Sequence, residues 1–316
     1  MENIVLKEIY GKDVLVEIVD SQEDANFITH AGTFHADEVI STVLLSNKFE
    51  NIKLARVNEV INKDAFVYDI GYGDFDHHGM DLNKVRENGI KNASCGLIWD
   101  AYGLDIIKEL NISNAEEFVS SIDKNLIMDI DRDDNGQSLN VEIPVKIQGI
   151  PNLISSFNPA WDDSLNENEC FLNAVSFANT IFNNIIKKMV AKEKAKEIVE
   201  QGIEKSENGI LILDNYMPWK DIVLSSSNPK AKDILYAVFP SKRGGYSIVA
   251  TPKEPGSFEV KQPFPASWAG LDELSLQKES NVDTITFCHK SLFICACKTF
   301  DDALKIANIA INGKNI

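Results

Sequence analysis

The sequence predicts an α/β protein, with a mainly parallel, open sheet in its first part and a smaller α+β domain at its C-terminal end. Short apolar runs alternate with segments of helical periodicity through the first part, and such alternation favours parallel strands joined by right-handed crossovers. β-type runs dominate the last third of the chain. Of the 316 residues, 44% are hydrophobic and 25% are charged, which excludes the fibrous, disordered and membrane classes and suits a globular chain of two domains.

An N-terminal extension, residues 1–24, comes first, and its runs 4–10 and 14–19 flank Gly11 and predict a hairpin. A catalytic domain is expected over residues 25–205. Its predicted strands cover residues 25–29, 52–57 and 65–70. Its predicted helices, which follow from apolar residues at helical spacing and from cap-like residues, cover residues 36–48, 93–102, 114–131 and 168–202.

The pattern changes between residues 202 and 209, and we expect residues 206–316 to form an α+β substrate-binding domain. Its predicted strands cover residues 210–213, 234–239, 246–250, 282–288 and 292–297, and a helix over residues 301–311 follows. We interpret the lysines and glutamates of residues 187–196 as a solvated helix face.

The formal net charge is −17, which argues against a protein that coats nucleic acid, because such binding requires cations that neutralise phosphates. A nuclease or nucleotidase remains compatible, since metal-ligand carboxylates contribute to the charge and a bound cation reverses the local field. The first 20 residues resemble neither a signal nor a transit peptide, and the five cysteines suit a reducing compartment. We therefore expect a cytoplasmic protein without a membrane partner.

Four of the five histidines lie between positions 30 and 78, in two clusters that also contain aspartates. The first cluster holds His30, His35 and Asp37, and the second is the triplet Asp76-His77-His78. Asp69 ends the apolar run that lies between them. Ligands of open α/β sheets bind at the carboxyl ends of the strands. A single histidine or aspartate has ordinary structural uses, but the whole set predicts a metal site at this edge.

Imidazole and carboxylate ligands suit Mn²⁺, Fe²⁺, Co²⁺ or Zn²⁺, and Mg²⁺ where carboxylates dominate. Two such cations about 3.5–4 Å apart need a bridging carboxylate, and the central Asp69 is the candidate. A third acidic group spans residues 129–134. It is not a calcium loop, because Gly136 follows too soon and no glutamate stands at the twelfth position.

These motifs resemble the DHH phosphoesterase superfamily, named for its Asp-His-His triplet, and more closely its Myg-type exonuclease family. The signature His-x-Gly-x-Phe-His-x-Asp-Glu of that family is intact at residues 30–38. Further similar pieces lie at residues 86–90, 93–99, 157–161, 218–220, 252–258 and 268–271. The resemblance implies a 3′→5′ exonuclease-like phosphodiesterase that acts on RNA or short oligonucleotides with two divalent cations, Mn²⁺ first and Mg²⁺ second.

The resemblance also implies roles for individual residues. The expected metal ligands are His30, His35, Asp37, Asp69, His77 and Asp131, with Asp134 as the alternative to Asp131. The expected catalytic residues are Asp69, which bridges the cations around the attacking water, and His78 and Arg86, which contact the phosphate. The candidate substrate contacts are Ser94, Gly96, Lys253 and His289.

Two departures from the family pattern concern substrate preference. Gly79 replaces the glutamine that usually follows the triplet, and Cys295-Ala296-Cys297 stands where relatives tend to carry Gly-Gly-His. A zinc site at Cys288, His289, Cys295 and Cys297 is an alternative to buried structural thiols. Alternatives for the whole chain are a non-catalytic nucleotide- or RNA-binding regulator on a hydrolase fold, and a metal-dependent hydrolase of pyrophosphate, cyclic dinucleotides or peptides. A homo-oligomer is compatible with either reading.

Overall fold

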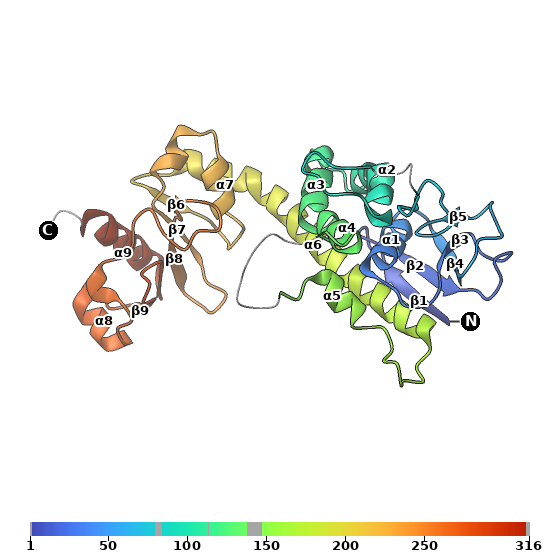
Figure 1. Cartoon of the computed structure of the whole chain (residues 1–316). Helices are drawn as coiled ribbons and strands as arrows, with labels where there is room; N and C mark the ends of the chain where they lie inside the picture. Colours follow the sequence, from blue (N-terminus) through green and yellow to red (C-terminus); the bar gives the residue numbers. More distant parts are fainter. Residues whose placement is uncertain (1, 80–83, 113, 138–146, 314–316) are drawn as a thin grey trace. The chain divides into compact units, whose positions relative to one another are not determined.

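The computed structural model describes residues 2–79, 84–112, 114–137 and 147–313. The chain divides into two compact units, Met1–Met189 and Val190–Ile316. Each unit contains a five-stranded mixed sheet with helices packed on it (Figure 1). The predicted mixed α/β class is confirmed.

The sheet of the first unit has the strand order β1-β2-β4-β3-β5. Its strands are β1 (Glu2–Lys7), β2 (Asp13–Ile18), β3 (Phe27–His30), β4 (Asn51–Val57) and β5 (Phe66–Val67). β1 and β2 form an antiparallel hairpin, and all other pairs are parallel. Because β4 and β5 lie on opposite sides of β3, the carboxyl end of β3 is a topological switch point, where α/β sheets bind their ligands.

β5 is shorter than the strand predicted over residues 65–70. Asp69 and Tyr72 have φ angles of 55° and 58°, and Gly71 has a φ of 87°. This left-handed backbone cannot continue a ladder, so the strand ends at Val67 and the chain turns into a loop.

The helices of the first unit are α1 (Ala36–Ser46), α2 (Ser94–Lys108), α3 (Ala115–Ile122), α4 (Met128–Asp134), α5 (Ile150–Ser155) and the start of α6 (Glu167–Lys205). All residues of α1 are buried, and the helix packs against α2, α4 and α5. The helix predicted over residues 114–131 is instead two α-helices joined by a π-helical turn, Asp123–Ile127. Such turns often occur near functional sites.

The sheet of the second unit has the order β6-β7-β8-β10-β9. Its strands are β6 (Ile210–Ile212), β7 (Tyr236–Pro240), β8 (Tyr246–Ala250), β9 (Ile285–Cys288) and β10 (Ile294–Cys297). The β6–β7 pair is parallel and the other pairs are antiparallel. Its helices are α7 (Lys220–Ser225), α8 (Glu273–Ser280), α9 (Phe300–Asn312) and the 3₁₀ turns Pro229–Asp233 and Ala266–Trp268. In the described part of the chain, no helix has the length and apolar character that a membrane span requires.

Candidate metal centre

The predicted side chains of the first unit meet at the carboxyl edge of its sheet. His30 is the last residue of β3, and Asp69 follows β5 by two residues. Because Ile28 pairs with Val67 in parallel register, His30 and Asp69 come out level with one another. His30 Nε2 lies 3.4 Å from Asp69 Oδ2 and 3.0 Å from Glu38 Oε1.

The first turn of α1 supplies the next group of ligand atoms. His35 precedes the helix with an extended backbone and donates its N–H to Glu38 Oε1 at 2.9 Å. Asp37 and Glu38 are fully buried. The ligand atoms of His30, His35 and Glu38 lie within 4.8 Å of one another. Glu38 was not among the predicted ligands, although it is the last residue of the Myg-type signature.

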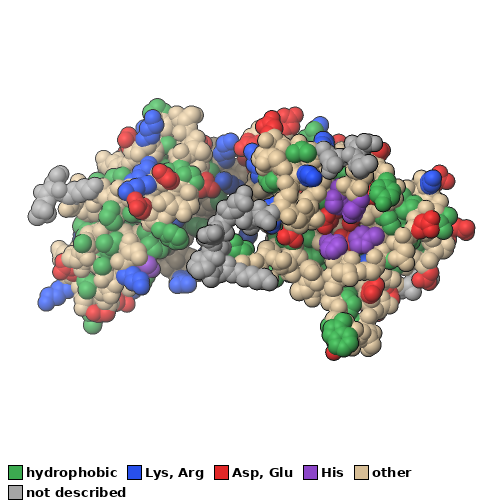
Figure 2. All heavy atoms as spheres, in the orientation of Figure 1, with side chains coloured by type: hydrophobic (Ala, Val, Ile, Leu, Met, Phe, Trp, Pro, Cys, Tyr) green, Lys and Arg blue, Asp and Glu red, His purple; other side chains and the backbone are tan. Residues whose placement is uncertain are grey.

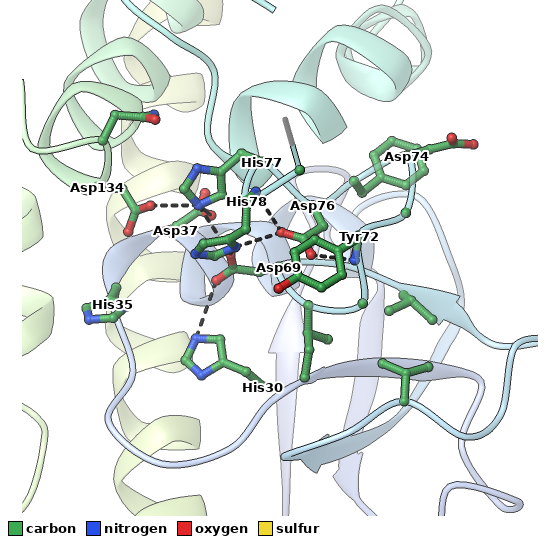
Figure 3. Close-up of a pocket in the computed structure, with 18 of the residues that line it drawn as sticks. His30, His35, Asp37, Asp69, Tyr72, Asp74, Asp76, His77, His78 and Asp134 are labelled. Atoms are coloured by element: carbon green, nitrogen blue, oxygen red, sulfur yellow. Dashed lines mark hydrogen bonds and ion pairs between the residues drawn. The ribbon is translucent and has the colours of Figure 1, made fainter. Parts of the chain in front are cut away.

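The three side chains of the Asp-His-His triplet have different contacts (Figure 3). His77 Nε2 lies 2.9 Å from Asp134 Oδ2, 3.4 Å from Asp69 Oδ1 and 3.9 Å from Asp37 Oδ2. His78 lies half-exposed beside Asp69, with its Nδ1 at 3.8 Å from Asp69 Oδ1. Asp76 is buried and orients its neighbour, because its Oδ1 accepts the backbone N–H of His78 at 3.0 Å and lies 2.7 Å from the ring Nδ1.

The N-terminus of α2 holds two of the carboxylates through backbone N–H groups. Ser94 and Cys95 donate theirs to Asp37 at 2.9 and 2.6 Å, and Ser94 Oγ donates to Asp69 Oδ1 at 3.2 Å. Gly96 donates its N–H to Asp131 at 3.1 Å. The positive end of a helix dipole favours negative charge at this place. Ser94 and Gly96, the predicted substrate contacts, thus donate to carboxylates of the protein.

Asp131 and Asp134 lie one turn apart on α4 but in different surroundings. Asp131 is fully buried; its Oδ1 accepts from the α2 N-terminus, and its Oδ2 lies 2.6 Å from Arg86 Nη2. Arg86 also pairs with Asp123 at 2.6 Å. Asp134 reaches His77 instead and lines the cleft. The structure therefore brings Asp134 together with His77 and Asp37, whereas Asp131 meets Asp37 and Cys95 at the α2 N-terminus and pairs with Arg86.

The electrostatics of this cluster follow from buried carboxylates at close range. Burial, followed by repulsion from Asp69, Asp134 and Asp131, raises the pKa of Asp37 well above its usual range. Burial lowers the pKa of His77, but the close carboxylates of Asp134 and Asp69 outweigh it and raise the pKa to about 11. The pKa of His30 also rises to about 11, because its bonds to Asp69 and Glu38 outweigh burial. The surplus of negative charge favours a cation here.

Two buried atoms support the same conclusion. Within the described residues, Glu38 Oε2 has no hydrogen-bond partner, and His77 Nε2 lies 2.9 Å from Asp134 Oδ2 without the geometry of a hydrogen bond. A buried polar atom without a partner is energetically unfavourable, and both atoms are ligand types for divalent transition metals. The acidic and histidine clusters of the structure can therefore hold metal ions, and their donor set fits.

The centre opens into a cleft of about 1620 Å³ on the face where the histidines of the first unit gather (Figure 2). This volume exceeds the roughly 300–1000 Å³ of most small-molecule pockets. Among the described residues, two lysines line the cleft, Lys63 and Lys91. The carboxylates that line it are Asp37, Glu59, Asp69, Asp74, Asp76, Asp133 and Asp134.

The remaining candidate residues belong to the second unit. Lys253 Nζ pairs with Glu259 at 2.8 Å, and His289 Nδ1 accepts the N–H of Ser291 at 3.0 Å. Their substrate contacts stay predictions. The thiols of β9 and β10 are buried and free, and none of the candidate metal groups among the described residues contains them, so the zinc alternative gains no support.

Comparisons with known proteins agree with the motifs. The chain matches the MYG1_exonuc family model, described as "Uncharacterised protein family (UPF0160)", over residues 26–311. The MYG1 protein of Dictyostelium discoideum is 29% identical, over 92% of this chain and 97% of the relative. The MYG1 protein of Schizosaccharomyces pombe is 25% identical, over 90% and 96%. The protein named MYG1 exonuclease of Homo sapiens is 25% identical, over 90% and 85%. No solved structure matches the chain.

Proposed function

The chain belongs to the MYG1 exonuclease family, and from the site at its sheet edge we propose that it is a metal-dependent phosphodiesterase that removes nucleotides from the 3′ end of RNA or short oligonucleotides. The observation that carries this proposal is the meeting of His30, Asp69 and His77 in one open cleft. The names of the relatives support the nuclease class. The intact triplet and first motif support a place in the DHH phosphoesterase superfamily.

The donor groups suit two cations rather than one. The first group is His30, His35 and Glu38, and the second is Asp37, His77 and Asp134. Asp69 stands between them, with Oδ2 facing His30 and Oδ1 facing His77, each at 3.4 Å. A carboxylate whose two oxygens face different donor groups is suited to bridge. When bound, Mn²⁺ or Mg²⁺ ions would acidify a water and neutralise charge on the phosphoryl oxygens.

His78 is the residue that we assign to the phosphate. Asp76 holds its Nδ1–H, so that Nε2 remains for the substrate. In the protonated ring Nε2–H can donate to a phosphate oxygen or to the leaving oxygen. Arg86 pairs with Asp123 and Asp131 and does not line the cleft among the described residues, so we assign it to holding Asp131 in place.

The decisive experiment measures hydrolysis and metal content in the same samples. The wild-type protein, stripped with EDTA and reloaded with Mn²⁺, is assayed on short oligoribonucleotides, oligodeoxynucleotides, pyrophosphate, a cyclic dinucleotide and a peptide. We expect 5′-mononucleotides to be released from the 3′ end, with activity lost in EDTA and restored by Mn²⁺. Hydrolysis of only one of the other substrates would mean that the chain acts on that substrate class instead. Hydrolysis of none of them would favour a binding protein.

Asp69→Asn tests the bridge. We expect this variant to fold normally, to lose at least about 100-fold in rate and to bind fewer Mn²⁺ ions per chain, because one bridging charge is gone. Asp64→Asn is the matched control, since Asp64 is exposed and does not line the cleft. Full activity of Asp69→Asn at unchanged metal content would refute the assignment.

A further inference from the structure

The loop between Asp69 and the triplet presents an aromatic ring to the cleft. Tyr72 lines the cleft and is 75% exposed, and Figure 3 shows it on the loop beside Asp76. Among the described residues its ring has no aromatic contact and its hydroxyl has no hydrogen bond. The face of the ring is therefore free to meet a ligand in the cleft.

The backbone of this loop is held in an unfavourable conformation. Tyr72 has a φ of 58°, where a residue with a side chain is strained and glycine is preferred. Its N–H donates to Asp76 Oδ2 at 2.6 Å. The preceding Gly71 packs so closely on Val60 that a Cβ atom there would lie 3.0 Å from Val60 Cγ2. The ring is thus displayed by a fixed turn, and a tyrosine kept at a strained position points to a use for its side chain.

The Asp76 carboxylate holds both the backbone of Tyr72 and the ring of His78. Asp76 Oδ2 accepts the Tyr72 N–H, and Asp76 Oδ1 holds the His78 ring at 2.7 Å. A ligand with its phosphate at His78 therefore has its neighbouring part near Tyr72. In a nucleotide that part is the sugar and base.

The negative charge of the cleft favours a contact with the base that does not depend on ionic attraction. Seven described carboxylates, two lysines and four histidines line it, and three of the histidines already contact carboxylates. Apart from bound metal ions, ionic contacts with phosphates can therefore contribute little affinity. Stacking on an aromatic ring does not depend on charge, tolerates every base, and contributes roughly 5- to 150-fold in affinity per base. Val60, Val67 and Ile70 line the same cleft and add apolar surface.

We propose that Tyr72 is the nucleobase subsite of this cleft, where its ring stacks on the base of the 3′-terminal nucleotide while His78 meets the adjoining phosphate. The proposal rests on the proposed function and names how that site holds its substrate. It predicts little preference among the four bases.

The test compares two short oligoribonucleotides that differ only at the 3′-terminal residue, which either carries its base or is abasic. Wild type, Tyr72→Phe and Tyr72→Ala are assayed on both. We expect Tyr72→Ala to raise KM about 10-fold or more for the substrate with the base, at nearly unchanged kcat. Tyr72→Phe should behave as wild type, and the abasic substrate should not distinguish the three proteins. Equal KM values of wild type and Tyr72→Ala for the base-bearing substrate would overturn the proposal.

A second readout does not depend on turnover. 2-Aminopurine riboside 5′-monophosphate is titrated in Mg²⁺, because its emission falls when the base stacks. Quenching by wild type and Tyr72→Phe but not by Tyr72→Ala supports the subsite, and equal quenching by all three refutes it. If wild type hydrolyses neither oligonucleotide, the proposed function fails, and the titration alone still decides whether Tyr72 binds a base.

Discussion

Asp131 and Asp134 show how two identical side chains on one helix serve different purposes. Asp131 faces two backbone N–H groups, the Cys95 thiol and a guanidinium, and burial raises its pKa to about 6 although Arg86 acts in the opposite direction. Asp131→Asn would turn an N–H₂ group toward some of these donors. We expect it to lower the free energy of unfolding by about 2–4 kcal/mol, since a buried charged partner is lost. Urea unfolding monitored by circular dichroism measures this.

Asp134→Asn should give the complementary result. Asp134 contacts His77 at the cleft, so we expect the variant to change unfolding by less than about 1 kcal/mol but to weaken Mn²⁺ binding about 10- to 100-fold. Calorimetric titration with Mn²⁺ provides the measurement. Strong destabilisation by Asp134→Asn, together with normal metal binding by it, would reverse the two roles.

Gly96 has a steric reason to be glycine. A Cβ atom at this position would lie 2.2 Å from Asp131 Oδ2 and 2.7 Å from Oδ1, both in a fully buried carboxylate. We expect Gly96→Ala to destabilise the protein by about 1–3 kcal/mol, because the carboxylate cannot move without losing its donors. Gly73→Ala is the control, since a Cβ atom there meets nothing within 4 Å. Thermal unfolding of both variants distinguishes them, and equal melting temperatures would contradict the argument.

At the scale of single residues, the meeting of His30 and Asp69 could be predicted, because strand ends in a parallel sheet share an edge. His77 could be added only through the Asp-His-His motif, since it lies in the loop beyond β5. The choice between Asp131 and Asp134 could not be predicted. The π-helical turn at Asp123–Ile127 has more residues per turn than an α-helix. The periodicity of α3 therefore does not predict which residues of α4 point toward the cleft. That these side chains bind metal and substrate stays a prediction.

The N-terminus of α2 is the element that assembles the centre, since it contacts Asp37, Asp69 and Asp131 together. Ser94→Ala removes only the hydroxyl that donates to Asp69. We expect it to weaken Mn²⁺ binding about 10-fold with little effect on folding, because groups that orient a ligand carboxylate have effects of this size. Ser120→Ala, at an exposed position of α3, is the control. Identical Mn²⁺ affinities of the two variants would show that the hydroxyl has no such part.

Helices and strands differ in how well the sequence predicts their limits. β8 agrees with its predicted range, because Gly244 and Gly245 precede the apolar run and Pro252 follows it closely. The helix predicted over residues 93–102 continues to Lys108, since Gly103 packs against Trp99 instead of ending the helix. The loop that shortens β5 depends on left-handed backbone at Asp69 and Tyr72, each of which costs about 1–2 kcal/mol. Propensity alone cannot predict such positions.

For the whole molecule, net charge is the property that limits how a nucleic acid can bind. The chain carries a formal charge of −17, and in the described part of the cleft two lysines oppose seven carboxylates. Single-stranded nucleic acid releases about 0.7 counterions per phosphate contact. For an octanucleotide, whose phosphates outnumber the two lysines, we therefore expect log K against log salt to have a slope no steeper than about −1.4, the value for two phosphate contacts. Fluorescence anisotropy from low to moderate KCl, at constant Mg²⁺, measures the slope. A slope of about −3 would mean that cationic side chains outside the cleft dominate binding, and stacking and the cations would then be minor contributors.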